Sequence, residues 1–354
     1  MRVRVAQKYM NFRKLILVVC SAIALASCGN GFLGLVAQRP PEKSRPTFGD
    51  WCRDRENLSP EAKKTVEVLL KEAGTTGCDA ANQKLSSFTQ LNLNYDDISD
   101  IKPLQSLTNL KLLDLSDNQI KDIKPLESLT NLTVLALYKN QISDIKPLQS
   151  LTKLTSLNLI DNKISDIKPL ESLTNLTEIS IDKNQISDIT ALQSLTKLTK
   201  LFLCCNKIND IKPLQSLTNL TKITLSNNKI SDIQPLQSGT NLTQLVIHQN
   251  RISDIKPLQS LTNLTILYLA HNKISDIKPL QSLTNLTILY LGNNQINDIK
   301  PLESLTSLTR LSLAHNKISD IKPLESLTLV TEINLSGNSI ARKTCPLSSG
   351  LCKW

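Results

Sequence analysis

The sequence predicts an α/β solenoid, in which about twelve stacked 22-residue units share one core, form a parallel sheet on a concave face and begin with a helical cap. Three observations predict this fold. From Phe88 the chain repeats every 22 residues without an insertion or deletion. Leu and Ile recur at fixed places in each unit. The 354 residues include only five Tyr, five Phe and two Trp, too few for an ordinary globular core.

An asparagine marks each unit after the first. In every unit Ile follows two residues after the marker position, and in all units but the last Asp follows four residues after it. Leu113 and Leu115 alternate as one face of a short strand, and no unit can bury that face alone, so the copies must stack. We expect the Asn amide to satisfy backbone groups of the turn that leaves each strand. Asp96 takes the marker position in the first unit, and Asn stands at 118, 140, 162, 184, 206, 228, 250, 272, 294, 316 and 338.

The Asp-Ile-Lys-Pro segment of each unit suits a tight return on the convex side, where Pro fixes its own backbone. Lys124 follows Asp122 in this segment, and most units have the same pair. We expect the two columns to compensate each other in solvent. The spacing lacks a loop that would gather the six or more oxygens of a calcium site.

This pattern matches the leucine-rich-repeat template and resembles the 22-residue repeats of bacterial internalin-like proteins, over residues 88–341. The resemblance implies a curved leucine-rich-repeat array. The repeat also resembles that of phosphatase regulatory subunits, which dock a catalytic partner in the cytosol. A scaffold of this kind does not by itself fix a function.

The first 27 residues are typical of an export signal, with basic residues up to Lys14 and an apolar run from Leu15 to Ala26. The sequence Leu25-Ala26-Ser27-Cys28-Gly29 resembles a bacterial lipobox, which implies cleavage before Cys28 and lipid attachment to its thiol. By the same resemblance, Gly29 rather than Asp after the cysteine favours the outer membrane in a Gram-negative cell. The alternative is plain secretion, because Ala24-Leu25-Ala26 also fits a small-residue cleavage site.

Residues 28–47 are expected to form a flexible tether, residues 48–87 a disulfide-closed helical cap and residues 342–354 a C-terminal cap. Ser59 and Pro60 predict a helix that runs to about Ala73 and is closed by Gly74. The cap from Trp51 to Gln83 also resembles N-terminal segments of cyanobacterial repeat proteins. We expect disulfides that each stay within one cap, pairing Cys52 with Cys78 and Cys345 with Cys352.

Cys204 and Cys205 are adjacent and left over, while Cys20 leaves with the signal. A vicinal disulfide would be strained, because neighbouring α-carbons are closer than disulfides usually require. A shared metal would need a partner, and His248 in the same column lies two repeats away, about 10 Å. We therefore interpret both as free thiols and expect no metal and no cofactor.

Two columns of each strand point away from the core and vary between units, so the concave face is the place to look for a ligand site. Exposed rings and aliphatic side chains on such a sheet indicate a contact patch, although drift in an unselected column is the alternative. We predict a site centred on six apolar residues and two histidines: Phe202, Val246, Ile266, Tyr268, Ile288, Tyr290, His248 and His271.

No catalytic motif is present. The chain lacks a phosphate-binding glycine loop and a His-Glu-x-x-His pattern, and it has three His without Asp and Ser around them. The formal charge is +10, and the signal removes five basic residues, which leaves 36 basic against 31 acidic residues, or +5. That mixed charge does not indicate nucleic-acid binding. We predict a monomeric, non-catalytic, protein-binding scaffold of the cell envelope. The alternatives are a regulatory subunit and a structural or glycan-binding envelope protein.

Overall fold

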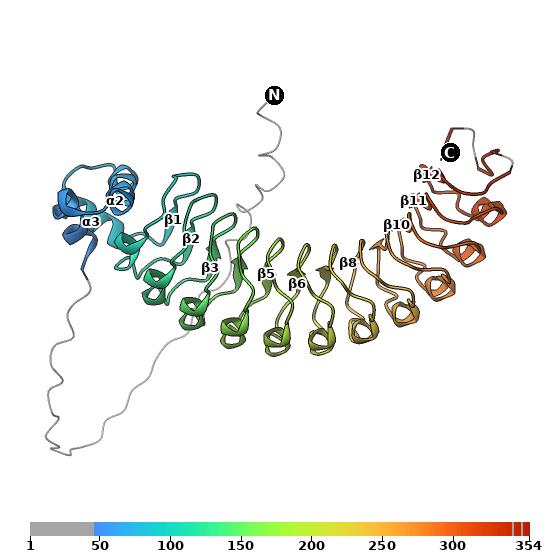
Figure 1. Ribbon diagram of the computed structural model, residues 1–354, viewed down its shortest axis with the longest axis horizontal. Coiled ribbons are helices and arrows are strands. Elements are labelled where there is room, and N and C mark those ends of the chain that lie inside the picture. The colour runs from blue at the N-terminus through green and yellow to red at the C-terminus, as the bar shows by residue number, and fades with distance from the viewer. Residues whose placement is uncertain (1–45, 342, 348–349) are drawn as a thin grey trace, which may run out of the picture. The chain divides into compact units, whose positions relative to one another are not determined.

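The computed structural model describes residues 46–341, 343–347 and 350–354, which form a curved solenoid with its strands on the inner side and short 3₁₀ helices on the outer side (Figure 1). The predicted signal peptide, the lipid attachment site Cys28 and nearly all of the tether lie outside the described residues. Within the described part of the chain, no helix is both long and apolar enough to cross a membrane.

Twelve repeat strands of three residues each form one parallel sheet in chain order, and a thirteenth strand from the C-terminal cap completes it. The register is one repeat at every step, so that Leu91 pairs with Leu113 and Leu113 with Leu135. The predicted solenoid is therefore confirmed. The strands are β1 Gln90–Asn92, β2 Leu112–Asp114, β3 Val134–Ala136, β4 Ser156–Asn158, β5 Glu178–Ser180, β6 Lys200–Phe202, β7 Lys222–Thr224, β8 Gln244–Val246, β9 Ile266–Tyr268, β10 Ile288–Tyr290, β11 Arg310–Ser312, β12 Glu332–Asn334 and β13 Cys352–Lys353.

The convex side consists of 3₁₀ helices, which in all units but two begin at the predicted Lys-Pro segment. Each Asp of the convex column caps its own turn: the Asp122 Oδ1 accepts the Lys124 backbone N–H at 2.8 Å, and ten other units repeat the bond. The helices are η3 Lys102–Leu104, η4 Lys124–Ser128, η5 Lys146–Ser150, η6 Lys168–Ser172, η7 Thr190–Ser194, η8 Lys212–Ser216, η9 Gln234–Ser238, η10 Lys256–Ser260, η11 Lys278–Ser282, η12 Lys300–Ser304 and η13 Lys322–Ser326.

The interleaved Asp and Lys charges of the convex face lie in solvent, mostly without direct ion pairs. Among the described residues, only Lys102 and Asp100 form an ion pair between the two columns, at 3.1 Å. The Asp carboxylates have a structural role, because each accepts a backbone N–H at the start of a 3₁₀ turn that has no backbone carbonyl as its partner.

The Asn column satisfies backbone groups of the turn after each strand, as predicted, and it also ties each turn to the preceding repeat. In the second copy the Asn118 Oδ1 accepts the Ile98 backbone N–H at 3.0 Å, and its Nδ2 donates to the carbonyls of Leu93 at 2.8 Å and Leu115 at 2.9 Å. One amide thus satisfies its own turn and that of the preceding repeat, where water cannot reach.

The residue before each marker adopts a left-handed backbone in all twelve copies, although glycine occupies the position only once, at Gly337. In the other copies φ lies between 53° and 62°, as at Asp117 (54°) and Gln249 (56°). The backbone N–H of these residues donates to the next repeat, for example from Gln249 to the Ala270 carbonyl at 2.9 Å. Stacking therefore imposes a conformation that side chains ordinarily disfavour.

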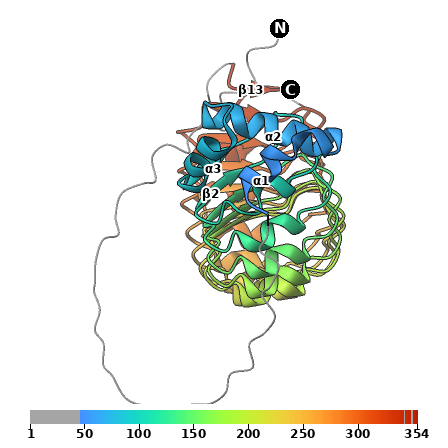
Figure 2. The same ribbon diagram turned by 90° about the vertical axis from the view of Figure 1, so that its left-hand side faces the viewer.

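Three helices cover the N-terminal end of the solenoid: α1 Phe48–Arg53, α2 Pro60–Ala73 and α3 Cys78–Ser86, with a short turn η2 Arg55–Asn57 between the first two (Figure 2). Helix α2 begins and ends where the sequence predicted. The Ser59 Oγ accepts the Ala62 N–H at 3.3 Å, and Gly74 closes the helix in the left-handed conformation with φ 64°.

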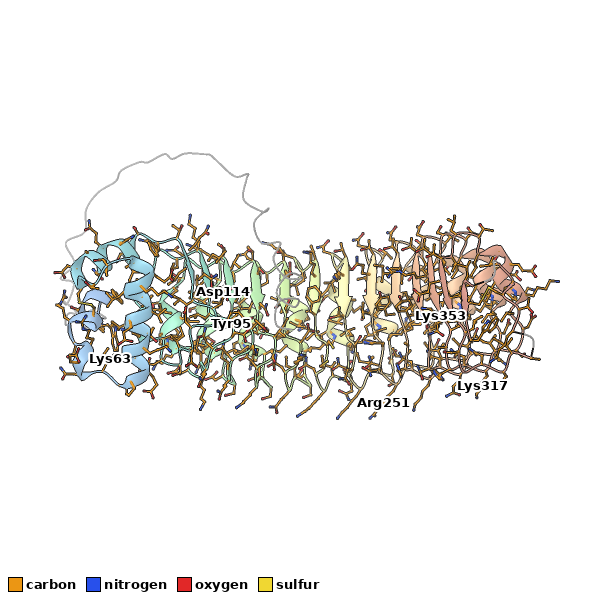
Figure 3. The ribbon with its side chains drawn as sticks, turned by 90° about the horizontal axis from the view of Figure 1, so that it is seen from above. Lys63, Tyr95, Asp114, Arg251, Lys317 and Lys353 are labelled. Atoms are coloured by element: carbon orange, nitrogen blue, oxygen red, sulfur yellow. A yellow bond between two sulfur atoms is a disulfide. The ribbon has the colours of Figure 1, made fainter. Side chains whose placement is uncertain are left out.

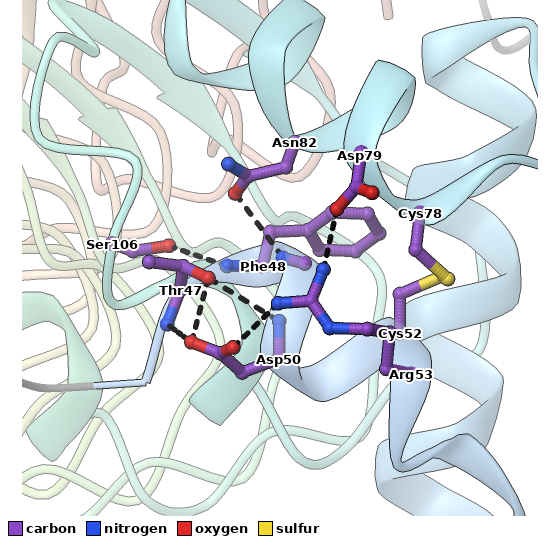
Figure 4. A network of polar contacts seen from close by, with 10 residues as sticks. Thr47, Phe48, Asp50, Cys52, Arg53, Cys78, Asp79, Asn82 and Ser106 are labelled. Carbon is purple, nitrogen blue, oxygen red and sulfur yellow. Dashed lines mark hydrogen bonds and ion pairs between the residues drawn. A yellow bond between two sulfur atoms is a disulfide. The ribbon is translucent and has the colours of Figure 1, made fainter.

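A polar network and a disulfide hold α1 against its neighbours (Figure 4). Cys52 of α1 is bonded to Cys78 of α3, and the Phe48 N–H donates to the Ser106 Oγ of the first repeat at 3.1 Å. The buried Phe48 ring belongs to the same apolar core as the repeats. The cap thus continues the core that the first repeat would otherwise expose to solvent.

The C-terminal end closes with the disulfide that the sequence predicted and with a strand that it did not. Strand β13 pairs with β12, and the Leu335 N–H donates to the Lys353 carbonyl at 2.7 Å. Cys352, which begins β13, is bonded to Cys345. A two-residue strand outside the 22-residue period leaves no pattern in the sequence.

Candidate protein-binding surface

The concave face consists of the first and third residues of each strand, because the middle residue points into the core. In β9 the side chain of Leu267 is fully buried, while Ile266 and Tyr268 are half-buried on the open face. The parallel register aligns Ile266 with Ile288 and Tyr268 with Tyr290. Two side-chain columns therefore run across the sheet, and the predicted apolar site residues lie in them.

Tyr268 and Tyr290 form a stacked pair, with ring centroids 4.6 Å apart and planes inclined by 15°. Such offset stacking stabilises the pair by about 0.5–1.5 kcal/mol. The rings cover one face of each other, and both side chains remain partly exposed. Val246 precedes Tyr268 in the same column and extends the apolar surface by one strand.

Phe202 lies apart from this group, with Thr224 between it and Val246 in the column. The Lys222 Nζ lies 5.3 Å from the centroid of the Phe202 ring, within the range of a cation–π contact. We call Phe202, Val246, Ile266, Tyr268 and Tyr290 the concave strip.

Ile288 does not belong to this strip, which corrects the sequence interpretation. Its side chain is only 7% exposed, although it lies outside the apolar core of the repeats. Ile266 and Arg310 flank it in register on the two neighbouring strands. At a strand spacing of about 4.8 Å, two long neighbours leave little of such a side chain open to a partner.

His248 and His271 lie at the ends of neighbouring strands, beside the concave strip. His248 is half-buried, and its Nδ1 has no hydrogen-bond partner among the described residues. Burial, and secondly the nearby His271, lower the pKa of His248, so its neutral form is favoured. His271 is exposed, with its Nε2 3.4 Å from the Asn293 Nδ2.

Cys204 and Cys205 follow β6 as free, half-buried thiols whose sulfurs lie 2.6 Å apart. Burial, and then a hydrogen bond with Cys205, raise the pKa of Cys204 to about 12, so this thiol is not activated as a nucleophile. No group of three or more His, Cys, Asp or Glu in the described part of the chain is placed to hold a metal ion.

Sequence reasoning missed the partly buried carboxyl of Asp182, one strand before Cys204. Burial raises its pKa to about 6, against a hydrogen bond from the Cys204 N–H that lowers it. Ser226 continues the same column and is 1% exposed, with an Oγ that has no partner in the described residues. The residue at this position of the repeat differs from unit to unit, so the 22-residue pattern does not indicate which units bury a polar side chain here.

A second polar group that sequence reasoning missed lies at the N-terminal end of the concave face. The Asp117 carboxylate is nearly buried and pairs with the Lys139 ammonium. Burial acts to raise the pKa of Asp117, but hydrogen bonds from Lys139, Tyr138 and Tyr95 outweigh it and lower the pKa. Tyr95 is 68% exposed and lies well away from the concave strip along the solenoid (Figure 3).

Two hollows lie on the convex face, between η8 and η9 and between η10 and η11. Their linings are the side chains of successive 3₁₀ turns, such as Lys212, Gln215 and Gln234 in the first. These hollows are open troughs between neighbouring repeats. The concave strip, by contrast, is a broad surface, which is the form expected for contact with a macromolecule.

Family models and solved structures agree with this architecture. A family model described as Leucine Rich repeats (2 copies) matches most of the chain, so the protein belongs to the leucine-rich-repeat family. The matched residues are 89–128, 108–150, 130–172, 152–194, 196–238, 240–280, 262–304 and 306–349. No curated protein matches the chain.

Within that family the chain is internalin-like. It is similar to an internalin (InlF) from Listeria monocytogenes, with 34% identity and a TM-score of 0.70 over 81% of this chain and 92% of that one. It is also similar to an internalin C2 of the same organism, with 31% identity and a TM-score of 0.51 over 70% of this chain and 98% of that one. A third similar structure is the functional domain of InlJ from Listeria monocytogenes, which includes a cysteine ladder. Its identity is 26% and its TM-score 0.68, over 82% of this chain and 61% of that one.

Proposed function

We propose that this protein is a monomeric, non-catalytic scaffold that binds a protein partner on the concave strip while lipid-anchored at the cell envelope. The observation that carries the proposal is the half-buried aromatic and aliphatic surface that β6, β8, β9 and β10 turn to the open side of the sheet. Every strand beneath it is fixed by the same inter-repeat hydrogen bonds. A rigid face binds with little loss of conformational entropy.

The side chains around the strip have the chemistry of an interface rim. Lys200, Arg310 and His271 lie at its borders and are exposed. Lys200 is held by an ion pair with Glu178 at 3.1 Å, an exposed contact that adds little stability but fixes a charge at the border. An apolar centre with a charged rim is the composition of protein interfaces, whose energy comes mainly from buried aromatic anchors.

A direct test uses the two stacked tyrosines. Replacing Tyr268 and Tyr290 with Ser should weaken binding by at least about 2 kcal/mol while the fold stays intact, because neither ring is part of the core. Partners would first be captured from envelope and secreted proteins with the mature chain. Binding of the double variant would then be measured by calorimetry.

The matched control replaces Tyr95 and Tyr138 with Ser, which removes two tyrosines near the N-terminal end of the same face. This control should bind the captured partner normally. If the Tyr268 and Tyr290 variant binds as well as the control, the strip is not the binding surface.

Three observations support display at the envelope. The sequence around Cys28 resembles a lipobox, both caps of the folded part are closed by disulfides, and the repeats are internalin-like. Disulfides persist in oxidising compartments outside the cytosol, which also argues against a cytosolic regulatory subunit.

Lipid attachment is tested by labelling cells with a fatty-acid analogue. The Cys28→Ser variant should lose the label and membrane retention. Cys20→Ser, which alters a cysteine inside the apolar run of the signal, is the control and should keep both. Label that persists on Cys28→Ser protein would show that the anchor is elsewhere or absent.

A further inference from the structure

The residue that follows the marker asparagine is basic in four successive repeats. These four residues are Lys207, Lys229, Arg251 and Lys273, and all are exposed; we call them the basic edge row. Gln185 and Gln295 bound the row, and Lys163 and Lys317 continue it beyond them. Arg251 and Lys317 lie along the same long edge of the solenoid and point outward (Figure 3). Four neighbouring cations thus face solvent beside the concave sheet.

The backbone sets the spacing of the row. The N–H of each member donates to an Ile carbonyl of the preceding repeat at 2.8 Å, for example from Lys229 to Ile208, from Arg251 to Ile230 and from Lys273 to Ile252. A direct bond between repeats holds successive members about one strand spacing apart, close to 4.8 Å. The row is therefore a regular line of charges on a rigid support.

Local acids do not neutralise this line. No member forms an ion pair within the described residues. The flanking columns are uncharged around the row, with Asn227 and Gln249 toward the concave face and Ser231 and Ser253 toward the convex face. The next column holds the Asp residues, whose Oδ1 atoms accept backbone N–H groups of the 3₁₀ turns.

We propose that the basic edge row binds a linear anionic polysaccharide, with acid groups spaced along the chain to match successive repeats. A regular line of cations is complementary to a polymer of regular anions. The amide side chains of Asn227 and Gln249 beside it can donate to and accept from sugar hydroxyls.

A carbohydrate polymer fits this row better than single-stranded nucleic acid. Proteins that bind single strands combine basic grooves with Phe, Tyr or Trp on which bases stack. The row and its two flanking columns, from Cys205 to Ser275, contain none of these residues. The surface is distinct from the concave strip, so this inference does not rest on the proposed protein-binding function.

The repeats supply a matched pair of variants. Replacing all four members with Gln uses the residue that other copies have at this place, as in Gln119 and Gln185. The control replaces Lys212, Lys256, Lys278 and Lys300 of the convex face with Gln, the residue that Gln234 supplies naturally. Both variants lose four positive charges, and both keep scaffold residues that the fold already accepts.

Binding of the mature protein and both variants to polygalacturonate, neutral dextran and single-stranded DNA is measured over a range of salt concentrations. We expect salt-sensitive binding to polygalacturonate and none to dextran. The edge variant should lose at least about tenfold in affinity, and the convex control less than about threefold. The Tyr268→Ser and Tyr290→Ser protein should bind polygalacturonate normally, which separates this site from the concave strip.

Three results would overturn the proposal. Equal losses in the edge and convex variants would show attraction by net charge alone. Equal or tighter binding of DNA by the unaltered protein would assign the row to nucleic acid. No binding to polygalacturonate at low salt would leave the row as a solvated edge of the solenoid.

Discussion

Asn228→Ala removes one amide from the middle of the asparagine column and leaves a defined set of groups without partners. The Asn228 Oδ1 accepts the Ile208 N–H at 3.0 Å. Its Nδ2 donates to the carbonyls of Leu203 and Leu225, both at 3.0 Å, and to Ser226 at 3.2 Å. Alanine replaces none of these bonds.

The expected cost follows from the unpaired Ile208 N–H. An unsatisfied buried donor costs about 1–3 kcal/mol, and the carbonyls that lose a donor add to this. Because Asn228 is partly rather than fully buried, we expect the total to stay within about 1–3 kcal/mol in the free energy of unfolding. Contacts in a solenoid reach only neighbouring repeats, so the effect should be strongest at the two turns that the amide joins.

Urea unfolding of the purified protein measures the total effect, and hydrogen exchange of the Ile208 amide measures the local one. Asn241→Ala is the matched control, since the Asn241 Nδ2 makes one exposed bond, to the Thr218 carbonyl at 2.9 Å, and other repeats have Lys197 or Ser307 at that place. If Asn228→Ala destabilises no more than this control, and Ile208 stays protected, the asparagine column does not hold the turns.

Three further predictions concern charge, backbone and cap. Burial raises the pKa of Asp182 to about 6 in the folded protein, so its ionisation should lower the stability of the fold as the pH rises from about 4 to about 6. Asp182→Asn should remove this pH dependence and stabilise the protein by about 2–3 kcal/mol at pH 7. Urea melts at a series of pH values would test both expectations. Gln249→Gly should relieve the strain of the left-handed backbone at this residue (φ 56°) and stabilise the protein by about 0.5–1 kcal/mol, whereas Gln249→Ala should not. A glycine variant that is less stable than the alanine variant would contradict this. Replacing both Cys52 and Cys78 with Ala should cost about 2–4 kcal/mol in thermal unfolding, and an unchanged melting temperature would show that the cap does not depend on its disulfide.

The concave site could be predicted only in part. The 22-residue period places Phe202, Tyr268 and Tyr290 on the open face, because side chains of a strand alternate between its two faces. The period does not tell how much of each side chain its neighbours cover. Ile288 occupies the same column as Ile266, yet it is nearly buried, since exposure depends on the sizes of the residues one strand away on both sides.

The roles of the charged columns could not be predicted from the sequence either. Nothing in the repeat pattern indicates that the convex Asp residues cap backbone turns while the basic edge row stays without ion pairs. Both facts depend on distances between atoms of neighbouring columns. The composition as a whole, with signs mixed along the repeats, conceals the line of like charges on one edge.

The sequence by itself determined the solenoid, its register, the buried Leu and Ile positions, the asparagine column and the cap helix α2. Each of these follows from a strict period or a local signal, such as Ser59 and Gly74 at the ends of α2. Only the tertiary structure decided the left-handed residue before each marker, the closing strand β13 and the polar groups buried after β5 and β7. These features arise from hydrogen bonds and packing between repeats. The left-handed residues have non-glycine side chains in eleven of twelve copies, because the stacked neighbours, and not the residue itself, fix that backbone.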